Sequence, residues 1–178
     1  MLPPDEVLRP ARIVCVAKKS LLGCLIRYVT GGPWNHCGLL DPPVFVLEAK
    51  DLNGTTATKQ EVFFDQKDIY KLGIYEVSNM NWESKMTTMA EAWKMQSKPY
   101  DTLQLLGIYL HKRFPFLTPH RMILDSEEKL ICSEFILRAF EKAGINLIPE
   151  NVHPGPVDPN MLVSHPRIKL VYLWTKPE

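Results

Sequence analysis

The most regular hydrophobic pattern in the chain begins just after Cys132. Apolar side chains with the three-and-four spacing of one buried helix face stand at positions 135, 136, 139, 140 and 143. Gly144 is placed to end this helix, because glycine adopts the left-handed C-terminal conformation at low steric cost. The pattern therefore predicts a helix whose first turn carries a cysteine.

Short β-rich segments, bounded by turn residues, predict a small antiparallel sheet. The expected strands are 11–17, 34–40, 44–50, 60–64, 72–77 and 168–174. Further helices are expected over 21–29, from Asn81 or Ser84 to about Gln96, and over 103–110. Residues 51–58 are expected to form a polar loop, and a turn is expected around 161–162. Because helices and strands are partly segregated along the chain, their order predicts an α+β fold.

Length and composition predict one domain over residues 11–178, preceded by an irregular, proline-rich segment at 1–10. A hydrophobic share of 46% is enough for a sizeable core. Lys plus Arg (21) nearly balance Asp plus Glu (20), so charge does not indicate nucleic acid or a charged membrane surface as a partner. Neither a membrane-spanning apolar run nor a secretory signal pattern is visible, so we expect a cytoplasmic protein without stable membrane insertion.

The four cysteines, Cys15, Cys24, Cys37 and Cys132, show no paired CxxC spacing. A zinc site or a disulfide framework is therefore not expected, and neither is another metal or cofactor. Free thiols fit a reducing compartment, where a thiol nucleophile stays available. Cys132 is the candidate nucleophile, because the N–H groups at a helix start favour a thiolate. The alternative is that Cys132 is a small buried hydrophobic residue, as most free cysteines are.

A nucleophilic Cys132 needs a base, and His36 is the candidate. If the turn after residue 40 centres on Pro42, His36 and Glu48 lie opposite each other in a hairpin, with Cβ atoms roughly 4.5–5.5 Å apart. A slip of one residue would place them on opposite faces. A carboxylate on one ring nitrogen fixes the tautomer and leaves the other nitrogen to accept a thiol proton. The alternative is an ordinary cross-strand pair on a solvated face. No such partner is evident for the other histidines, which are His111, His120, His153 and His165.

Five short motifs follow one another along the chain. They are Asn-His-Cys-Gly-Leu at 35–39, Val-Leu-Glu-Ala at 46–49, Pro-Tyr-Asp at 99–101, Ile-Cys-Ser-Glu-Phe at 131–135 and Pro-Asn-Met-Leu at 159–162. In this order the chain resembles the circularly permuted papain-like amidases of the NlpC superfamily, in which histidine precedes cysteine. These are relatives of bacterial cell-wall peptidases and of lecithin:retinol acyltransferase. The resemblance spans residues 11–175.

The resemblance implies that Cys132 is the nucleophile, His36 the base and Glu48 the residue that orients His36. It also implies a small antiparallel sheet packed against the cysteine helix. Members often open the first strand with Gly-Asp, where this chain has Pro-Ala-Arg at 10–12, and many have Ser-His where it has Asn-His at 35–36. Neither departure removes a catalytic group, so both concern substrate preference.

The groups that would stabilise an oxyanion are less well marked. The backbone N–H of Cys132 is the expected first donor, since it stands at a helix start. Tyr100 is the candidate for a second group near the site, although a tyrosine hydroxyl often only anchors a loop. Trp34, close to His36, either lines the cleft or belongs to the core.

These residues predict hydrolysis of an amide bond, in a peptide or peptidoglycan fragment, through a thioester on Cys132. Two other functions stay open. One is lipid acyl transfer or thioester cleavage by the same chemistry, and the other is binding without catalysis, since fold does not fix function. Specificity is expected to depend on the loops 51–58, 114–125 and 149–160, whose residues do not name a substrate.

Overall fold

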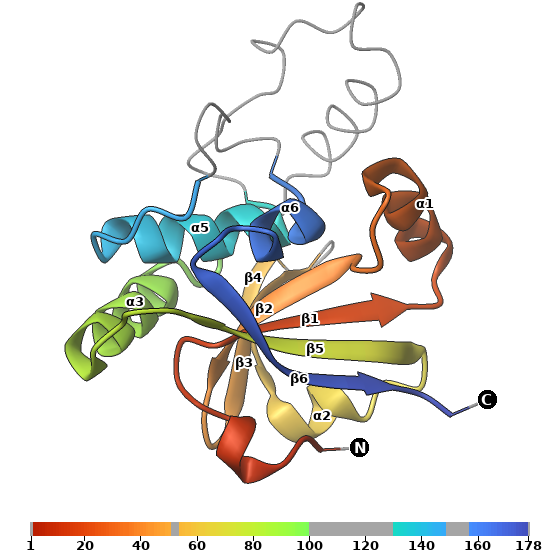
Figure 1. The fold of residues 1–178 in the computed structure, drawn as a ribbon, viewed down its shortest axis with the longest axis horizontal. Helices are drawn as coiled ribbons and strands as arrows, with labels where there is room; N and C mark the ends of the chain where they lie inside the picture. The colour runs from red at the N-terminus through yellow and green to blue at the C-terminus, as the bar shows by residue number, and fades with distance from the viewer. Residues whose placement is uncertain (1, 51–53, 100–129, 149–156, 178) are drawn as a thin grey trace, which may run out of the picture.

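Within the described residues, 2–50, 54–99, 130–148 and 157–177, the computed structural model contains one six-stranded antiparallel sheet in the order β4-β3-β2-β1-β5-β6 (Figure 1). The strands are β1 (Ile13–Lys18), β2 (His36–Asp41), β3 (Phe45–Lys50), β4 (Gly54–Lys59), β5 (Ile69–Val77) and β6 (Ile168–Thr175). The helices are α1 (Leu21–Thr30), α2 (Gln60–Phe64), α3 (Trp82–Lys94), α5 (Cys132–Lys142) and α6 (Pro159–Val163).

Each face of the sheet has its own hydrophobic core. On β1, Ile13 and Cys15 join the core that includes residues of α3, α5 and α6, whereas Val14 and Val16 join the core that includes α2. Figure 1 shows α5 and α6 on one side of the sheet and α2 on the other. The expected α+β fold is thus confirmed, with the cysteine helix packed against an antiparallel sheet.

The helix boundaries follow from capping chemistry. Ser20 caps α1 by accepting the N–H of Gly23 at 3.0 Å, and Asn81 caps α3 by accepting the N–H of Ser84 at 2.8 Å. The start of α3 therefore lies at Asn81, the first of the two predicted positions. Beyond the end of α5, Gly144 has φ +76°, the left-handed conformation predicted for it.

Two neighbouring predictions are wrong. Residues 60–64, the expected strand, form helix α2, because Gln60, Phe63 and Phe64 are buried at the i, i+3 and i+4 positions of one turn. Most of the expected loop 51–58 is instead strand β4, whose backbone pairs with β3, as in Glu48 opposite Thr56. The expected turn at 161–162 lies within the short helix α6. The helix expected over 103–110 lies outside the described residues.

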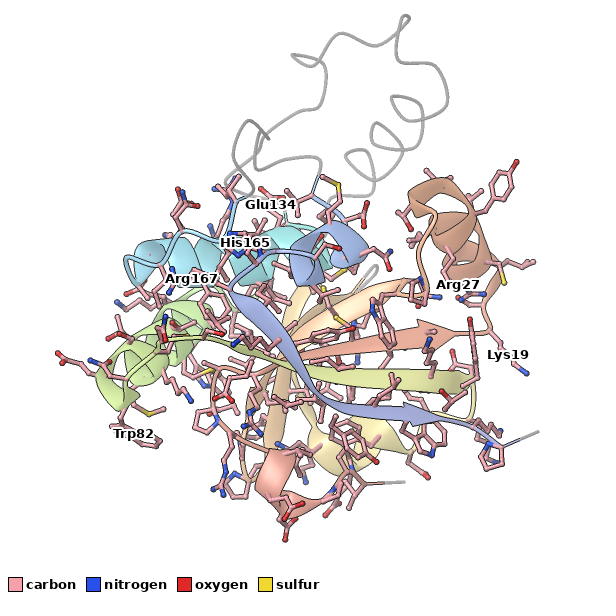
Figure 2. The ribbon with its side chains drawn as sticks, in the orientation of Figure 1. Lys19, Arg27, Trp82, Glu134, His165 and Arg167 are labelled. Atoms are coloured by element: carbon pink, nitrogen blue, oxygen red, sulfur yellow. The ribbon has the colours of Figure 1, made fainter. Side chains whose placement is uncertain are left out.

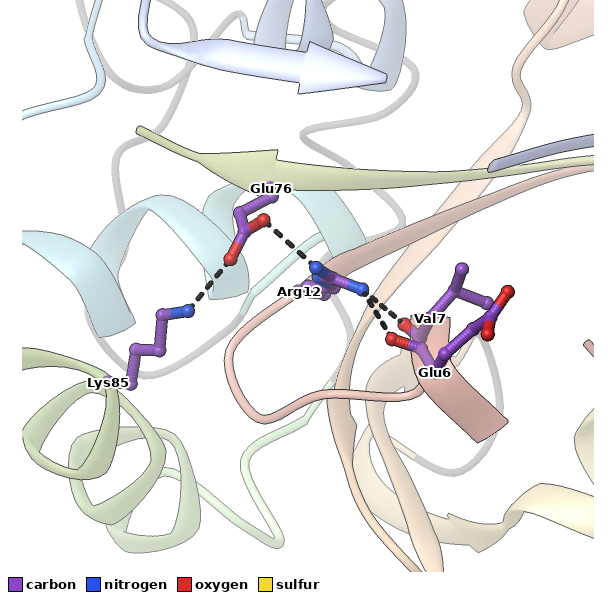
Figure 3. A network of polar contacts seen from close by, with 5 residues as sticks. All are labelled: Glu6, Val7, Arg12, Glu76 and Lys85. Carbon is purple, nitrogen blue, oxygen red and sulfur yellow. Dashed lines mark hydrogen bonds and ion pairs between the residues drawn. The ribbon is translucent and has the colours of Figure 1, made fainter. Parts of the chain in front are cut away.

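Arg12 attaches the N-terminal segment to the sheet (Figure 3). Its guanidinium donates to the Val7 carbonyl at 3.0 Å and to Glu76 Oε2 at 2.9 Å, and Lys85 of α3 donates to Glu76 Oε1 at 2.8 Å. Although burial alone would raise the pKa of Glu76, Lys85 and Arg12 lower it. The expected irregular segment 1–10 contains a 3-10 turn, Asp5–Val7, which this network holds beside β1.

Candidate active site

Cys132 is the first residue of α5, and only 5% of it is exposed. The residue before it, Ile131, has an extended backbone (φ −88°, ψ 165°) and makes no side-chain capping bond. The adjacent Ser133 donates its hydroxyl to the Val157 carbonyl at 2.6 Å. This bond fastens the start of the cysteine helix to the segment that leads into α6.

His36 is the first residue of β2 and stands opposite Val16 of β1. Its Nε2 lies 2.6 Å from Oε2 of Glu48, whose side chain is fully buried. The preceding residue, Asn35, accepts the N–H of Lys18 at 3.1 Å and donates to the Lys18 carbonyl at 2.9 Å. Asn35 therefore holds the start of β2 against the end of β1 and fixes the position of His36.

The hairpin register differs from the predicted one by two residues. Asp41 pairs with Phe45 across a three-residue turn, so the partner of Glu48 is Gly38 rather than His36. An even shift keeps both side chains on the same face, and Glu48 meets His36 as a diagonal neighbour. Gly38 leaves this crossing open, since a Cβ there would lie 3.3 Å from the Glu48 Cβ and 2.8 Å from Val46 Cγ1.

Cys132 and His36 influence each other: Cys132 acts to raise the pKa of His36, and His36 acts to lower the pKa of Cys132. Because Nε2 of His36 faces Glu48, Nδ1 is the ring nitrogen left to exchange a proton with a thiol. Burial opposes a charge on His36, but the bonds with Cys132 and Glu48 outweigh it and raise the pKa of His36 to about 9. Burial likewise opposes the charge on Glu48, yet His36 and Lys50 lower its pKa to about 2.

Cys37 opposes the thiolate form of Cys132. The Cys37 thiol, together with burial, raises the pKa of Cys132 well above its usual range, while His36 acts in the opposite direction. Loss of one proton from the coupled pair of Cys132 and His36 is therefore the step that favours a nucleophilic sulfur. All four cysteines of the chain are free thiols.

Two lysines lie near the Glu48 carboxylate. Lys50 Nζ is 2.6 Å from Glu48 Oε1 and donates to Thr58 Oγ1 at 2.9 Å. Lys18 Nζ donates to Gln66 Oε1 at 2.6 Å, and its pKa is lowered by burial against the attraction of Glu48. Neither Lys50 nor Lys18 was predicted from the sequence to belong to the site. The available signal for Lys50 was its place two residues after Glu48, which puts both side chains on one face of a strand.

A cavity of about 600 Å³ lies beside Trp34, between the loop that leads into β2 and helix α6. Asn160 joins these two elements. Its Oδ1 accepts the Trp34 N–H at 2.9 Å, and its Nδ2 donates to the Trp34 carbonyl at 2.9 Å and to Thr30 Oγ1 at 3.0 Å. Trp34 is 4% exposed and packs edge-to-face on Tyr75, so it belongs to the core and also lines the cavity.

Polar side chains around this cavity already bind other parts of the protein. Ser164 donates to the Asn160 carbonyl at 2.7 Å, and His165 Nδ1 accepts the N–H of Arg167 at 3.2 Å (Figure 2). Burial, and then the charge of Arg167, lower the pKa of His165, which favours the neutral ring. The cavity therefore offers a ligand mainly apolar groups, which come from Pro33, Trp34, Met161 and Val163.

The described residues cover only some of the other predicted features. Tyr100 and the loop 114–125 lie outside the described residues, so the second oxyanion donor stays a prediction. In the part of the chain that the structure describes, no group of three or more His, Cys, Asp or Glu side chains could hold a metal ion. Among the same residues, no helix combines the length and apolar character needed to cross a membrane.

Comparison with known proteins identifies a structural relative. The fold matches that of the metalloprotein yiiX from Escherichia coli O157:H7 with a TM-score of 0.70, over 95% of this chain and 98% of that chain, at 16% sequence identity. No family model matches the sequence, and neither does a curated protein. The match confirms the α+β, papain-like fold of the permuted type that the motif order implied. At this identity it establishes the fold alone.

Proposed function

We propose that the protein is a cysteine hydrolase that cleaves an amide bond, in a peptide or a cell-wall-type isopeptide, through a thioester on Cys132. The observation that carries this proposal is the pairing of His36 with a buried carboxylate beside a cysteine that it influences. Glu48 Oε2 lies 2.6 Å from His36 Nε2, and His36 acts to lower the pKa of Cys132. These observations support Cys132 as nucleophile, His36 as base and Glu48 as the orienting carboxylate of an acyl transfer.

In the proposed mechanism, the site first loses one proton, which leaves a single proton shared between Cys132 and His36. The sulfur attacks the carbonyl carbon, and Nδ1 of His36 carries the thiol proton and gives it to the leaving amine as the C–N bond breaks. Water then attacks the thioester and passes a proton to Nδ1. The C–S bond breaks, which releases the acid and restores Cys132. Glu48 stabilises the imidazolium throughout and keeps its own charge.

The oxyanion formed in each step needs hydrogen-bond donors. The backbone N–H of Cys132 is the proposed first donor, because N–H groups in the first turn of a helix have no partner within the helix. The partial positive charge of the α5 N-terminus acts in the same direction. The sulfur and this donor belong to the same residue, so attack brings the carbonyl oxygen close to it.

A second candidate function, cleavage or transfer of a fatty acyl group, is favoured by the cavity beside Trp34. The cavity volume, about 600 Å³, lies in the range of small-molecule sites. Its exposed lining is mainly apolar, and Trp34 stands only two residues before His36. An acyl chain in this cavity would be anchored beside Trp34. The bond that is broken, amide or ester, distinguishes this function from the first.

The test is incubation with a panel of short peptides and p-nitrophenyl acyl esters, followed by intact-mass detection of an adduct on Cys132. We expect a thioester that disappears in Cys132→Ala and forms more slowly in His36→Gln. Cys24→Ala, at an exposed cysteine of α1, is the matched control and should keep the adduct. Full turnover by Cys132→Ala would exclude a cysteine hydrolase. Adducts from esters alone, with no peptide cleaved, would favour the acyl function.

A further inference from the structure

Glu48 is a buried carboxylate held between two cationic side chains. None of its side chain is exposed, and each oxygen has its own neighbour: Oε2 lies 2.6 Å from His36 Nε2 and Oε1 lies 2.6 Å from Lys50 Nζ. An ionised carboxylate is costly to bury unless it is paired. His36 must change its charge during the proposed reaction, so it cannot be the sole constant partner. Lys50 can, because its ammonium takes no part in the proposed proton transfers.

We propose that Lys50 is a positioning residue of the active site: its ammonium group keeps the buried Glu48 carboxylate ionised and turned toward His36. It thereby sets the pH at which Cys132 becomes nucleophilic. This inference rests on the proposed function of the site.

The local structure fixes the Lys50 ammonium from two sides. Lys50 and Glu48 alternate with Ala49 along β3, so they share one face of the sheet. On β4, Thr58 accepts a hydrogen bond from Nζ at 2.9 Å, and the residue opposite Lys50 is Gly54. The Lys50 side chain is 26% exposed, so water solvates the far side of the ammonium.

Other titratable groups also act on this carboxylate and its histidine. Lys18 of β1 interacts with Glu48 through space and is itself attracted by Asp68, from the turn before β5, while Cys132 of α5 influences His36 and is itself influenced by Cys37 of β2. The ammonium of Lys18 is directed to the neutral amide of a glutamine. Lys50 is therefore the lysine in direct contact with the carboxylate.

The sign of the effect follows from the charge. The Lys50 cation shares the charge of Glu48 and so weakens the attraction of that carboxylate for the imidazolium, which favours the state of the Cys132 and His36 pair that has lost one proton. Removal of Lys50 should therefore shift the activation of Cys132 to higher pH. Removal of one charge next to a partly solvated site should shift the midpoint pH of Cys132 activation by about one unit.

The experiment measures the rate of iodoacetamide labelling at Cys132 between pH 5 and pH 10, by mass spectrometry of the peptide that contains it. We expect Lys50→Met to raise the midpoint of the profile by about one pH unit, and Lys50→Arg to restore it. Lys59→Met removes an exposed lysine at the end of β4 and should leave the profile unchanged. Labelling of the exposed Cys24 provides an internal reference in every sample.

A midpoint that stays unchanged in Lys50→Met would overturn the proposal. In the Glu48→Gln background the same substitution should have little effect, because Lys50 acts through the carboxylate. An undiminished shift there would show a direct charge effect and would also overturn it.

If Lys50→Met does not fold, Thr58→Val replaces it in the test. This variant keeps Lys50 and removes only the hydrogen bond from Nζ to Thr58. A smaller upward shift is expected, and no shift counts against the role of Lys50. Labelling that is indifferent to His36→Gln would contradict the proposed function instead.

Discussion

Glu48 reaches His36 diagonally across the hairpin: the two side chains meet at 2.6 Å, although the residue opposite Glu48 is Gly38. This crossing is possible because Gly38 has no side chain between them. It buries the pair of His36 and Glu48 on one face of the sheet. The pair links the reactivity of the site to the stability of the fold, so both should depend on pH.

The first consequence is a stability maximum in mildly acidic solution. Glu48 has a pKa of about 2 in the folded protein, below its ordinary 4.5, so its contribution is complete above pH 4.5 and is lost as the pH falls toward 2. His36 has a pKa of about 9, above its ordinary 6.5, so its contribution is complete below pH 6.5 and is lost as the pH rises through 9. Denaturant titrations should give the highest free energy of unfolding between pH 4.5 and pH 6.5.

Glu48→Gln should remove most of this dependence. Breaking a buried ion pair costs roughly 3 kcal/mol, and the difference from the wild type should shrink as the pH approaches 9. Glu76→Gln is the control, because that carboxylate is 31% exposed and pairs with Arg12 and Lys85 rather than with a histidine. If the wild type and Glu48→Gln lost the same amount of unfolding free energy at alkaline pH, that loss could not be assigned to His36.

Cys37 should restrain the reactivity of Cys132. Its thiol is the largest influence that raises the pKa of Cys132, so Cys37→Ala should lower that pKa. Each pKa unit changes the thiolate fraction about tenfold when the pH is below the pKa. We expect iodoacetamide to label Cys132 about threefold to tenfold faster at pH 7 in this variant.

Cys15→Ala is the matched control for Cys37→Ala. Cys15 is equally buried on the same face of the sheet, and it is the β1 partner of Cys37. Its removal creates a similar cavity but leaves the Cys37 thiol beside Cys132. Equal acceleration in both variants would mean that loosened packing, rather than the thiol contact, controls the rate.

Asn160 should hold the base in place from a distance. Its side chain makes three hydrogen bonds, two to the backbone of Trp34 in the loop before β2 and one to Thr30 at the end of α1. Asn160→Ala should cost about 1–3 kcal/mol of unfolding free energy and should slow the labelling of Cys132, because this loop leads into His36. Asn146→Ala, which removes a single exposed bond to Ile148, should change neither quantity noticeably.

If Asn160→Ala lost stability but kept the full rate of Cys132 labelling, Asn160 would stabilise the fold without positioning His36. Comparison at matched fractions of folded protein separates the two effects. The same measurement on both asparagine variants removes the general cost of deleting an amide.

Local patterns in the sequence were enough for the elements that carry their own signals. The cysteine helix was predicted from its apolar spacing and from Gly144, and α1 and α3 from the capping residues Ser20 and Asn81. The strand over β4 was not, because it forms by backbone pairing with β3 rather than by a pattern of its own. The apolar run at 62–64 suited a strand, but its burial follows a helical turn.

For the candidate site, the sequence by itself determined the residue types and the alternation of side chains along each strand. Whether His36 and Glu48 share a face depended on the register of the hairpin. The tertiary structure decided the register, through a three-residue turn, and it decided which groups surround the pair. Lys50 and Cys37 gain their influence from proximity in a buried, poorly screened environment. Their contacts depend on how β2, β3, β4 and α5 pack together, and no local sequence pattern predicts that packing.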